Sequence, residues 1–308
     1  MKATTDQRAD LAVNDIAELR QGFVVSLRSQ NKAAKTIKSY VEAIDLYREF
    51  AVRVGMPTTI DRVNRDHVET FIADQLERWQ PKTAQIRYGA LQQFFKWCVE
   101  EGEITASPMA NMKPPSVPDS MVPVVSDDDL KKLLKVCEGK EFTERRDTAI
   151  LRLFIDCGLR LGEVAGLTTE DIDWDLEVVL VTGKGSRPRA VPFSSRTAQA
   201  LDRYRRMRRQ HPWSKAAAFW LGPKGALTTS GVAQVVKRRC AQAGIEQLHP
   251  HMLRHTAAHH AAKSGLGDSD MMRVFGWRSR TMLNRYGASA ADERARDAYK
   301  RLAPGDRL

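Results

Sequence analysis

Six residues in the second half of the sequence have side chains that together could act on a phosphate ester. In chain order they are Arg160, Lys184, His251, Arg254, Trp277 and Tyr286. Arginine offers a planar, permanently charged fork that fits phosphate oxygens, and a tyrosine hydroxyl can attack phosphorus as a nucleophile. Lysine and histidine can supply or remove the protons that such an exchange needs. The residue types therefore suit phosphoryl transfer in which the protein's own cations stand in for a metal ion, with no cofactor.

Each of these residues alone has a commoner explanation. Arg160 follows a helix end, where a cation offsets the helix dipole, and Lys184 lies in a glycine-flanked turn, where a lysine is usually just solvated. His251 lies three residues before Arg254, so the two share a helix face, and the nearby histidines lack the acid or cysteine partners of a metal site. A tryptophan near a helix end, such as Trp277, is more often a packing residue. What distinguishes the set is that all of its members occur, in order, on one basic chain.

The chain carries an excess of positive charge. Its 308 residues include 49 Lys and Arg against 38 Asp and Glu, which gives a net charge of +11 and a pI near 9.6. Such a balance favours a polyanionic partner, nucleic acid first, although a basic surface can also serve solubility alone. The cysteines form no CxxC pair, and neither a signal peptide nor a membrane span is recognisable, which predicts a cytoplasmic protein with reduced thiols.

Composition divides the chain into two domains and a linker. The stretch 107–124 contains five prolines and lacks helical periodicity, so we expect an extended linker there. Residues 1–106 carry the apolar periodicity of four helices, and we expect a small helical bundle. Residues 125–308 are expected to form a mostly helical domain with a small antiparallel sheet, whose strands at 177–182 and 190–193 flank a tight turn. The expected fold class is therefore mainly α.

Apolar residues recur at helical spacing in both domains. In the first domain the third helix is expected at 65–78 and the fourth from Pro81 to near Gly102. In the second domain a helix is expected to begin near Ser126, where three aspartates follow a good N-cap residue. Further helices are expected at 144–158, 195–209, 229–243, 253–264, 268–275 and 290–302.

The ordered set of six resembles the hallmark residues of the tyrosine recombinase (phage integrase) family, which includes Xer-like enzymes. That hallmark is Arg, Lys, His-x-x-Arg, His or Trp, and then Tyr. The surrounding segments GLRLGEVAGLTTEDID, VTGKGSRPRAVP and HPHMLRHT look familial too, and LQQFFKWCVEEGEI resembles part of the family's core-DNA-binding bundle. Many members have His where Trp277 stands. Because an indole donates a hydrogen bond but is neither acid nor base, we expect Trp277 to pack and donate only.

The resemblance implies an enzyme that cuts and rejoins DNA at specific sites. Tyr286 would form a 3′-phosphotyrosine bond, which conserves the energy of the broken phosphodiester, and strands would exchange through a Holliday junction without metal or ATP. Arg160 and Arg254 would neutralise the charge that develops on the phosphate oxygens. Lys184 would protonate the leaving 5′-oxygen, and His251 would be the base for the tyrosine hydroxyl.

Other residues are expected to support the site or to contact DNA. Glu163, three residues beyond Arg160, is expected either to orient the site through hydrogen bonds or to form only a surface salt bridge. Five basic residues near helix starts or in basic patches are candidate DNA contacts, and each could instead be a solvated surface charge. They are Lys35, Lys82, Arg87, Lys237 and Arg239. Contacts of this kind would make DNA binding steeply dependent on salt.

The resemblance also implies how the enzyme assembles. The helical bundle and the catalytic domain would grip double-stranded DNA from opposite faces, and a tetramer would form on paired sites, with accessory DNA-bending proteins as further partners. The segment 290–302 would pack on a neighbouring subunit or on its own domain. No membrane partner is expected, and the location would be the cytoplasm, with the nucleoid.

Two other classes of protein stay open. One is a DNA-binding regulator with the same fold that no longer cuts, although the intact set of six argues against it. The other is a relaxing enzyme of the type IB topoisomerase kind, against which the N-terminal bundle argues. Among recombinases, a phage integrase, a Xer-like resolvase and a transposon or integron enzyme remain alternatives.

Overall fold

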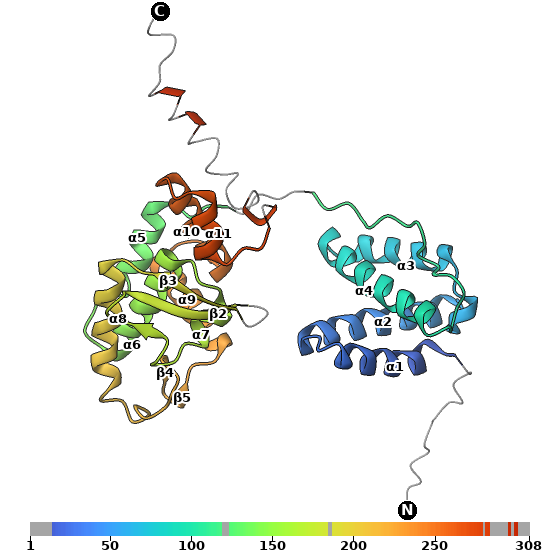
Figure 1. Cartoon of the computed structure of the whole chain (residues 1–308), viewed down its shortest axis with the longest axis horizontal. Helices are drawn as coiled ribbons and strands as arrows, with labels where there is room; N and C mark the ends of the chain where they lie inside the picture. The colour runs from blue at the N-terminus through green and yellow to red at the C-terminus, as the bar shows by residue number, and fades with distance from the viewer. Residues whose placement is uncertain are drawn as a thin grey trace, which may run out of the picture. The chain divides into compact units, whose positions relative to one another are not determined.

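The computed structural model describes residues 14–118, 123–183, 187–279, 281–283, 295–296 and 299–300. The chain forms two compact units, Met1–Asp119 and Ser120–Leu308 (Figure 1). Helices dominate both units, and the sheets among the described residues are small and antiparallel. The expected fold class is confirmed. Most of the expected helix at 290–302 lies outside the described residues.

The N-terminal unit consists of helices whose ends follow local chemistry. They are α1 (Ile16–Ser29), α2 (Ala34–Val54), α3 (Arg65–Arg78) and α4 (Pro81–Glu100), with a 3-10 turn, η1 (Ile60–Arg62), between α2 and α3. The Asp15 carboxylate accepts a hydrogen bond from the Ala17 N–H and so caps α1. Gly55, with φ 74°, ends α2 in the left-handed conformation. Pro81 starts α4, where an N–H would have no partner within the helix.

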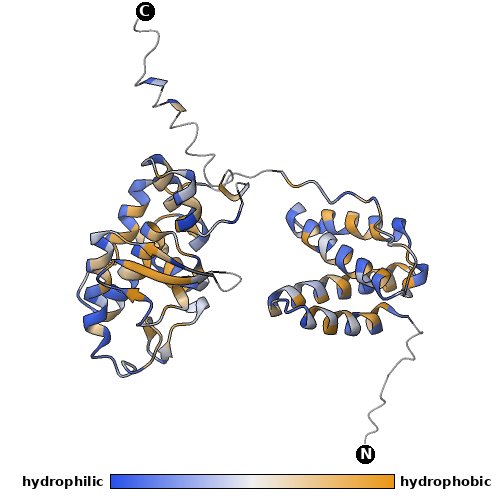
Figure 2. Cartoon of the chain, in the orientation of Figure 1, coloured by the Kyte–Doolittle hydropathy of each residue, from blue (hydrophilic) through white to orange (hydrophobic). Residues whose placement is uncertain are grey.

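Aromatic side chains fill the core of this unit. Phe23, Tyr47, Phe71 and Phe94 are at most 3% exposed. The ring of Phe71 meets that of Tyr47 edge to face at 5.4 Å, and Phe94 meets Phe23 in the same way at 5.6 Å. Figure 2 shows hydrophobic residues along one side of each helix, as amphipathic helices around a shared core require. These contacts link α2 with α3 and α1 with α4, so that α1, α2, α3 and α4 share one core.

The second unit is built mainly from helices. They are α5 (Asp127–Lys135), α6 (Phe142–Arg152), the π-helical turn η2 (Leu153–Cys157), α7 (Leu161–Ala165), α8 (Ser195–Arg208), α9 (Thr229–Ala243), α10 (Pro250–Lys263) and α11 (Asp268–Phe275). The expected helix at 144–158 is α6 continued by η2, and it ends at Gly158 with φ 56°. No described helix is long and apolar enough to cross a membrane.

Two small sheets lie among the described residues of this unit. β1 (Ile172–Asp173), β2 (Val178–Gly183) and β3 (Arg187–Pro192) form an antiparallel sheet in that order, and β4 (Leu221–Gly222) pairs with β5 (Gly225–Ala226). The expected start of the second strand at residue 190 was wrong, because Gly183 pairs with Arg187 and the strand begins there. Charged residues and a proline at the start of β3 resemble a turn. β1, β4 and β5 were not predicted, since two residues carry no readable alternation.

Candidate active site

Arg254 lies on α10 with its side chain buried, at 2% exposure. Its Nη1 donates to the carbonyl oxygen of Gly158 at 2.7 Å, and its Nη2 donates to the carbonyl oxygen of Phe275. These carbonyls stand at the C-terminal ends of η2 and α11, where the helix dipole is negative and stabilises a cation. These two bonds use two of the five N–H groups of the guanidinium.

Two glycines allow this close arrangement. Gly158 and Gly276 both adopt the left-handed conformation, with φ of 56° and 61°, and each terminates its helix. A Cβ on Gly158 would lie 2.5 Å from the ring of Phe275, and a Cβ on Gly276 would lie 3.2 Å from the guanidinium of Arg189. Larger residues would therefore push the ends of η2 and α11 apart and away from the arginines.

Arg160 is the N-cap residue of α7, and its side chain is 41% exposed. Its Nη1 donates to Oε1 of Glu163 at 2.8 Å, and its Nη2 donates to the carbonyl oxygen of Gly276 at 3.3 Å. Phe275, whose carbonyl holds Arg254, immediately precedes Gly276. Two arginines are thus anchored on neighbouring peptide groups, and their positive charges converge beside the end of α11.

Glu163 is the carboxylate that fixes this arrangement. Its two oxygens accept parallel bonds from Nη1 and Nη2 of Arg189 at 2.9 and 2.8 Å, and one of them also accepts the Arg160 backbone N–H at 2.8 Å. Burial alone would raise the pKa of Glu163, but the bonds from Arg189 and Arg160 lower that pKa from 4.5 to about 2. Its side chain is only 7% exposed, so it is not a surface salt bridge.

Arg189 was not singled out from the sequence. It lies on β3, and its Nε also donates to the carbonyl oxygen of Val274, so it ties the strand to α11. Its position two residues before Val191 could have indicated that it is buried. Alternate residues of a strand share a face, and Val191 is fully buried. A cation on a buried face needs a buried acid. The signal was missed because the strand was expected to begin after Arg189.

Replacing Glu163 by glutamine is expected to lower the free energy of unfolding at pH 7 by about 3 kcal/mol, the equivalent of the pKa difference between 4.5 and about 2. Because the pKa is lower in the folded state, the wild type holds this advantage above pH 4.5. It should lose the advantage as the pH falls from there toward 2. Urea unfolding of both proteins from pH 7 to pH 2 measures the difference.

The matched control is Asp202→Asn on α8, where the carboxylate pairs with Arg205 and Arg206 at 3.2 Å and is 37% exposed. Such an exposed pair is worth about 1 kcal/mol or less, at every pH. A wild-type advantage over Glu163→Gln that stayed constant from pH 7 to pH 2 would contradict the ionised, buried state of Glu163.

The structure describes two of the remaining expected site residues, and they differ in exposure. His251 lies on the first turn of α10 with an exposed side chain, three residues ahead of the buried arginine on the same helix. Trp277 is 5% exposed, and its ring stacks on that of Phe275 with 5.0 Å between centroids. It therefore packs beside the carbonyl groups that hold the arginines. Lys184 and Tyr286 lie outside the described residues.

Three candidate DNA contacts belong to the N-terminal unit. Lys35 lies exposed in the first turn of α2, and Lys82 lies exposed in the first turn of α4. Arg87 is half-buried, donates to Gln75, and holds its guanidinium over the ring of Trp79 at 5.0 Å. These three residues stay predicted DNA contacts.

The two candidates on α9 differ in their surroundings. Arg239 is 7% exposed, and its Nε and Nη2 bond to the fully buried carboxylate of Asp147 on α6 at 2.9 and 2.8 Å. Since this guanidinium joins two helices in the interior, we withdraw Arg239 from the expected DNA contacts. Lys237 is exposed on the same helix and stays a prediction.

The sequence matches models of two families of domains. The phage integrase family model covers residues 123–293, and the model of the phage integrase N-terminal SAM-like domain covers residues 19–103. A tyrosine recombinase XerC of Xanthomonas axonopodis pv. citri (strain 306) is 32% identical over 213 residues, which are 68% of this chain and 68% of that protein. A tyrosine recombinase XerC of Bacillus pumilus (strain SAFR-032) is 29% identical over 255 residues, 80% of this chain and 83% of its own length.

Solved structures share the fold. The XerH site-specific recombinase bound to palindromic difH substrate matches with a TM-score of 0.73 at 17% identity, over 92% of this chain and 84% of that chain. The Tn1549 transposon integrase in complex with transposon right end DNA also matches with a TM-score of 0.73, at 19% identity, over 94% of this chain and 99% of that chain. Both similarities extend over the two units.

Proposed function

The chain belongs to the phage integrase family and is a tyrosine site-specific recombinase, and from this membership we propose which of its residues cut and rejoin DNA. The observation that carries the proposal is the convergence of Arg160 and Arg254 on the carbonyl groups of the consecutive residues Gly276 and Phe275. Two guanidiniums anchored so closely can hold the non-bridging oxygens of one phosphodiester. Because backbone carbonyls fix them, they are preorganised for the charge that develops during attack.

The proposed reaction is a reversible transfer of the DNA phosphate to tyrosine. The hydroxyl oxygen of Tyr286 attacks phosphorus, a 3′-phosphotyrosine bond forms, and the bond from phosphorus to the 5′-oxygen breaks. His251 accepts the phenol proton, and Lys184 gives a proton to the leaving 5′-oxygen. Arg160 and Arg254 neutralise the additional negative charge of the transition state. A 5′-hydroxyl of the partner strand later reverses the step, so no ATP is consumed.

Neighbouring residues keep this site in shape. Glu163 positions the guanidinium of Arg160, and Arg189 holds Glu163 ionised in turn. Trp277 stacks on Phe275 at one side of the site, and its indole can donate a hydrogen bond but is neither an acid nor a base. None of these three groups is proposed to move a proton.

We propose that both domains bind the target duplex. The helical bundle of residues 1–106 would contact the core site through Lys35, Lys82 and Arg87, and the linker 107–124 would join it to the catalytic domain 125–308, which adds Lys237. The similar λ integrase has been solved as a tetramer bound to a Holliday junction. A tetramer on paired sites is the form proposed for this chain, assisted by DNA-bending proteins and acting on nucleoid DNA in the cytoplasm.

The role of Lys184 has a direct chemical test. Lys184→Ala should lower cleavage of ordinary DNA by about 10²- to 10⁴-fold, the range that general acids contribute. It should cleave DNA near the wild-type rate when the leaving 5′-oxygen is replaced by sulfur, because a thiolate leaves without a proton. Cleavage rates on the two substrates, measured for both proteins, give the rescue factor.

The matched control is Arg160→Ala on the same pair of substrates. Its defect lies in charge neutralisation at the non-bridging oxygens, so sulfur at the leaving position should not restore it. If Lys184→Ala were equally slow on the sulfur-substituted DNA, the acid would be another residue.

A further inference from the structure

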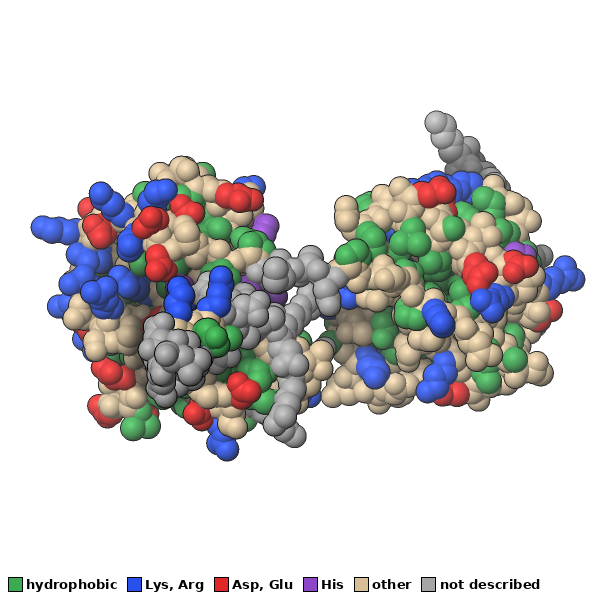
Figure 3. All heavy atoms as spheres, turned by 90° about the horizontal axis from the view of Figure 1, so that it is seen from above, with side chains coloured by type: hydrophobic (Ala, Val, Ile, Leu, Met, Phe, Trp, Pro, Cys, Tyr) green, Lys and Arg blue, Asp and Glu red, His purple; other side chains and the backbone are tan. Residues whose placement is uncertain are grey.

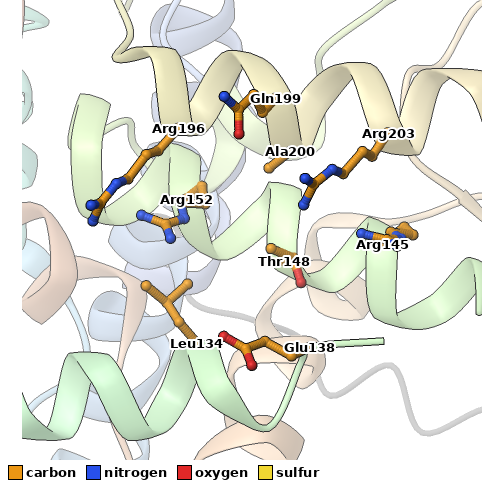
Figure 4. Close-up of a pocket in the computed structure, with 9 residues that line it drawn as sticks. All are labelled: Leu134, Glu138, Arg145, Thr148, Arg152, Arg196, Gln199, Ala200 and Arg203. Atoms are coloured by element: carbon orange, nitrogen blue, oxygen red, sulfur yellow. The ribbon is translucent and has the colours of Figure 1, made fainter. Parts of the chain in front are cut away.

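A pocket of about 260 Å³ lies between α5, α6 and α8, and arginines dominate its lining. Figure 4 shows the four of them, Arg145 and Arg152 from α6 and Arg196 and Arg203 from α8. Glu138 is the one acid among the nine lining residues. The lining therefore carries a net charge of +3, the sum of four arginines and one glutamate.

The spacing of the arginines places a cationic pair at each end of this pocket, which we call the channel. On both helices the two arginines are seven residues apart, which is about two turns, or about 10 Å, along one helix face. Figure 4 shows Arg152 beside Arg196 at one end and Arg145 toward Arg203 at the other. Between the pairs, Figure 4 shows the small residue Ala200 on α8 and Thr148 on α6.

Among the described residues, the four arginines of the channel are only partly offset by acids, of which Glu138 lies in the lining. None of the four lies within 4.0 Å of a carboxylate in the part of the chain that the structure describes. Acids are available nearby, since Arg206 on the same helix pairs with Asp202 at 3.2 Å. Burial and the charge of Arg196 lower the pKa of Arg152, and the opposing effects of Asp156 and Glu138 do not cancel this shift. An anion in the channel would remove this repulsion.

We propose that this channel is a second anion site, which binds a phosphate-bearing polyanion through the arginine pairs at its two ends. Figure 1 shows α8 along one edge of the catalytic unit, and none of the nine lining residues of the channel belongs to the candidate active site. Figure 3 shows Lys and Arg side chains gathered toward that same edge of the unit. The backbone of DNA and a soluble oligophosphate share this chemistry. The inference does not depend on the proposed catalytic roles.

The test compares charge-neutral variants of the channel with a matched control on the same helix. The channel variants are R152Q/R196Q and R145Q/R203Q, and the control is R206Q/R209Q, which removes two exposed arginines outside the lining. Calorimetric titration of the full chain with inorganic tripolyphosphate should show saturable binding. Each channel variant should weaken it by about tenfold or more, the effect of losing hydrogen bonds to a charged group, and the control by less than about twofold.

A second probe identifies the source of the polyanion. Binding of a duplex of unrelated sequence is measured against salt concentration, where each lost arginine–phosphate contact lowers the logarithmic slope by about 1. A lower slope in the channel variants than in the control assigns the site to DNA. An unchanged slope together with weakened tripolyphosphate binding assigns it to a soluble oligophosphate. Unfolding curves should show that the variants are at least as stable as the wild type. Equal effects of channel and control variants on both probes would overturn the proposal.

Discussion

Arg160→Ala is expected to slow DNA cleavage by about 10²- to 10³-fold or more, the effect of removing one preorganised donor from a developing negative charge. Affinity for the DNA site should fall far less, because many other cations contact the backbone. The fold should survive, since the side chain is 41% exposed and Glu163 keeps both of its bonds to Arg189. Single-turnover cleavage and equilibrium binding on the same DNA measure the two quantities.

Arg160→Lys is the informative companion variant. Lysine keeps the charge but lacks the fork that reaches Glu163 and the Gly276 carbonyl together. It should bind DNA like the wild type and recover only part of the cleavage rate. A loss of affinity as large as the loss of cleavage, in either variant, would show that Arg160 serves binding rather than the transition state.

Arg254→Lys is expected to reduce cleavage by a similar factor, about 10²- to 10³-fold, and also to destabilise the protein. The buried guanidinium bridges carbonyl oxygens at Gly158 and Phe275, and a lysine ammonium cannot reach both and still face a phosphate. Leaving one buried carbonyl without a donor costs about 1–3 kcal/mol. Cleavage should therefore be measured well below the unfolding temperature of the variant.

The chain offers a matched control for this variant in Arg208→Lys. Arg208 is also buried, at 5% exposure, and it donates to the carbonyl oxygens of Phe219, at 2.9 Å, and Ser214, at 3.0 Å. It should lose at least comparable stability, because its Nη2 also donates to the carbonyl oxygens of Ala216 and Ala218, and it should keep its cleavage rate. If both variants lost cleavage in proportion to stability, the effect at Arg254 would be structural.

Sequence patterns were sufficient to predict the long helices and to select the two arginines of the site. The bounds expected for α3, residues 65–78, agree with the structure because Asn64 caps the helix and apolar residues repeat regularly along it. Arg160 and Arg254 could be selected because they recur in an ordered family pattern. The structure adds what no local pattern contains, namely that both are anchored beside the C-terminal end of α11.

The sequence analysis misjudged Arg239 and overlooked Arg189 for the same physical reason. Arg239 looked like a surface cation because its partner, Asp147, lies 92 residues away in the sequence. Arg189 looked like part of a turn because the acid that neutralises it, Glu163, lies on another element, 26 residues away. A buried ion pair is a property of tertiary packing, and each of its members alone reads as an ordinary surface charge.

The most direct test of the central claim is a covalent trapping experiment with wild type and Tyr286→Phe. Nicked DNA duplexes carrying candidate sites from the protein's own genetic neighbourhood let the short cleaved fragment escape, and the products are separated on denaturing gels. The recombinase assignment predicts a protein–DNA adduct with wild type, in the presence of EDTA, and none with Tyr286→Phe. An adduct that persisted in the variant would move the nucleophile to another residue. Absence of any adduct on DNA that the protein binds would contradict cleavage itself and favour a non-cutting DNA-binding regulator.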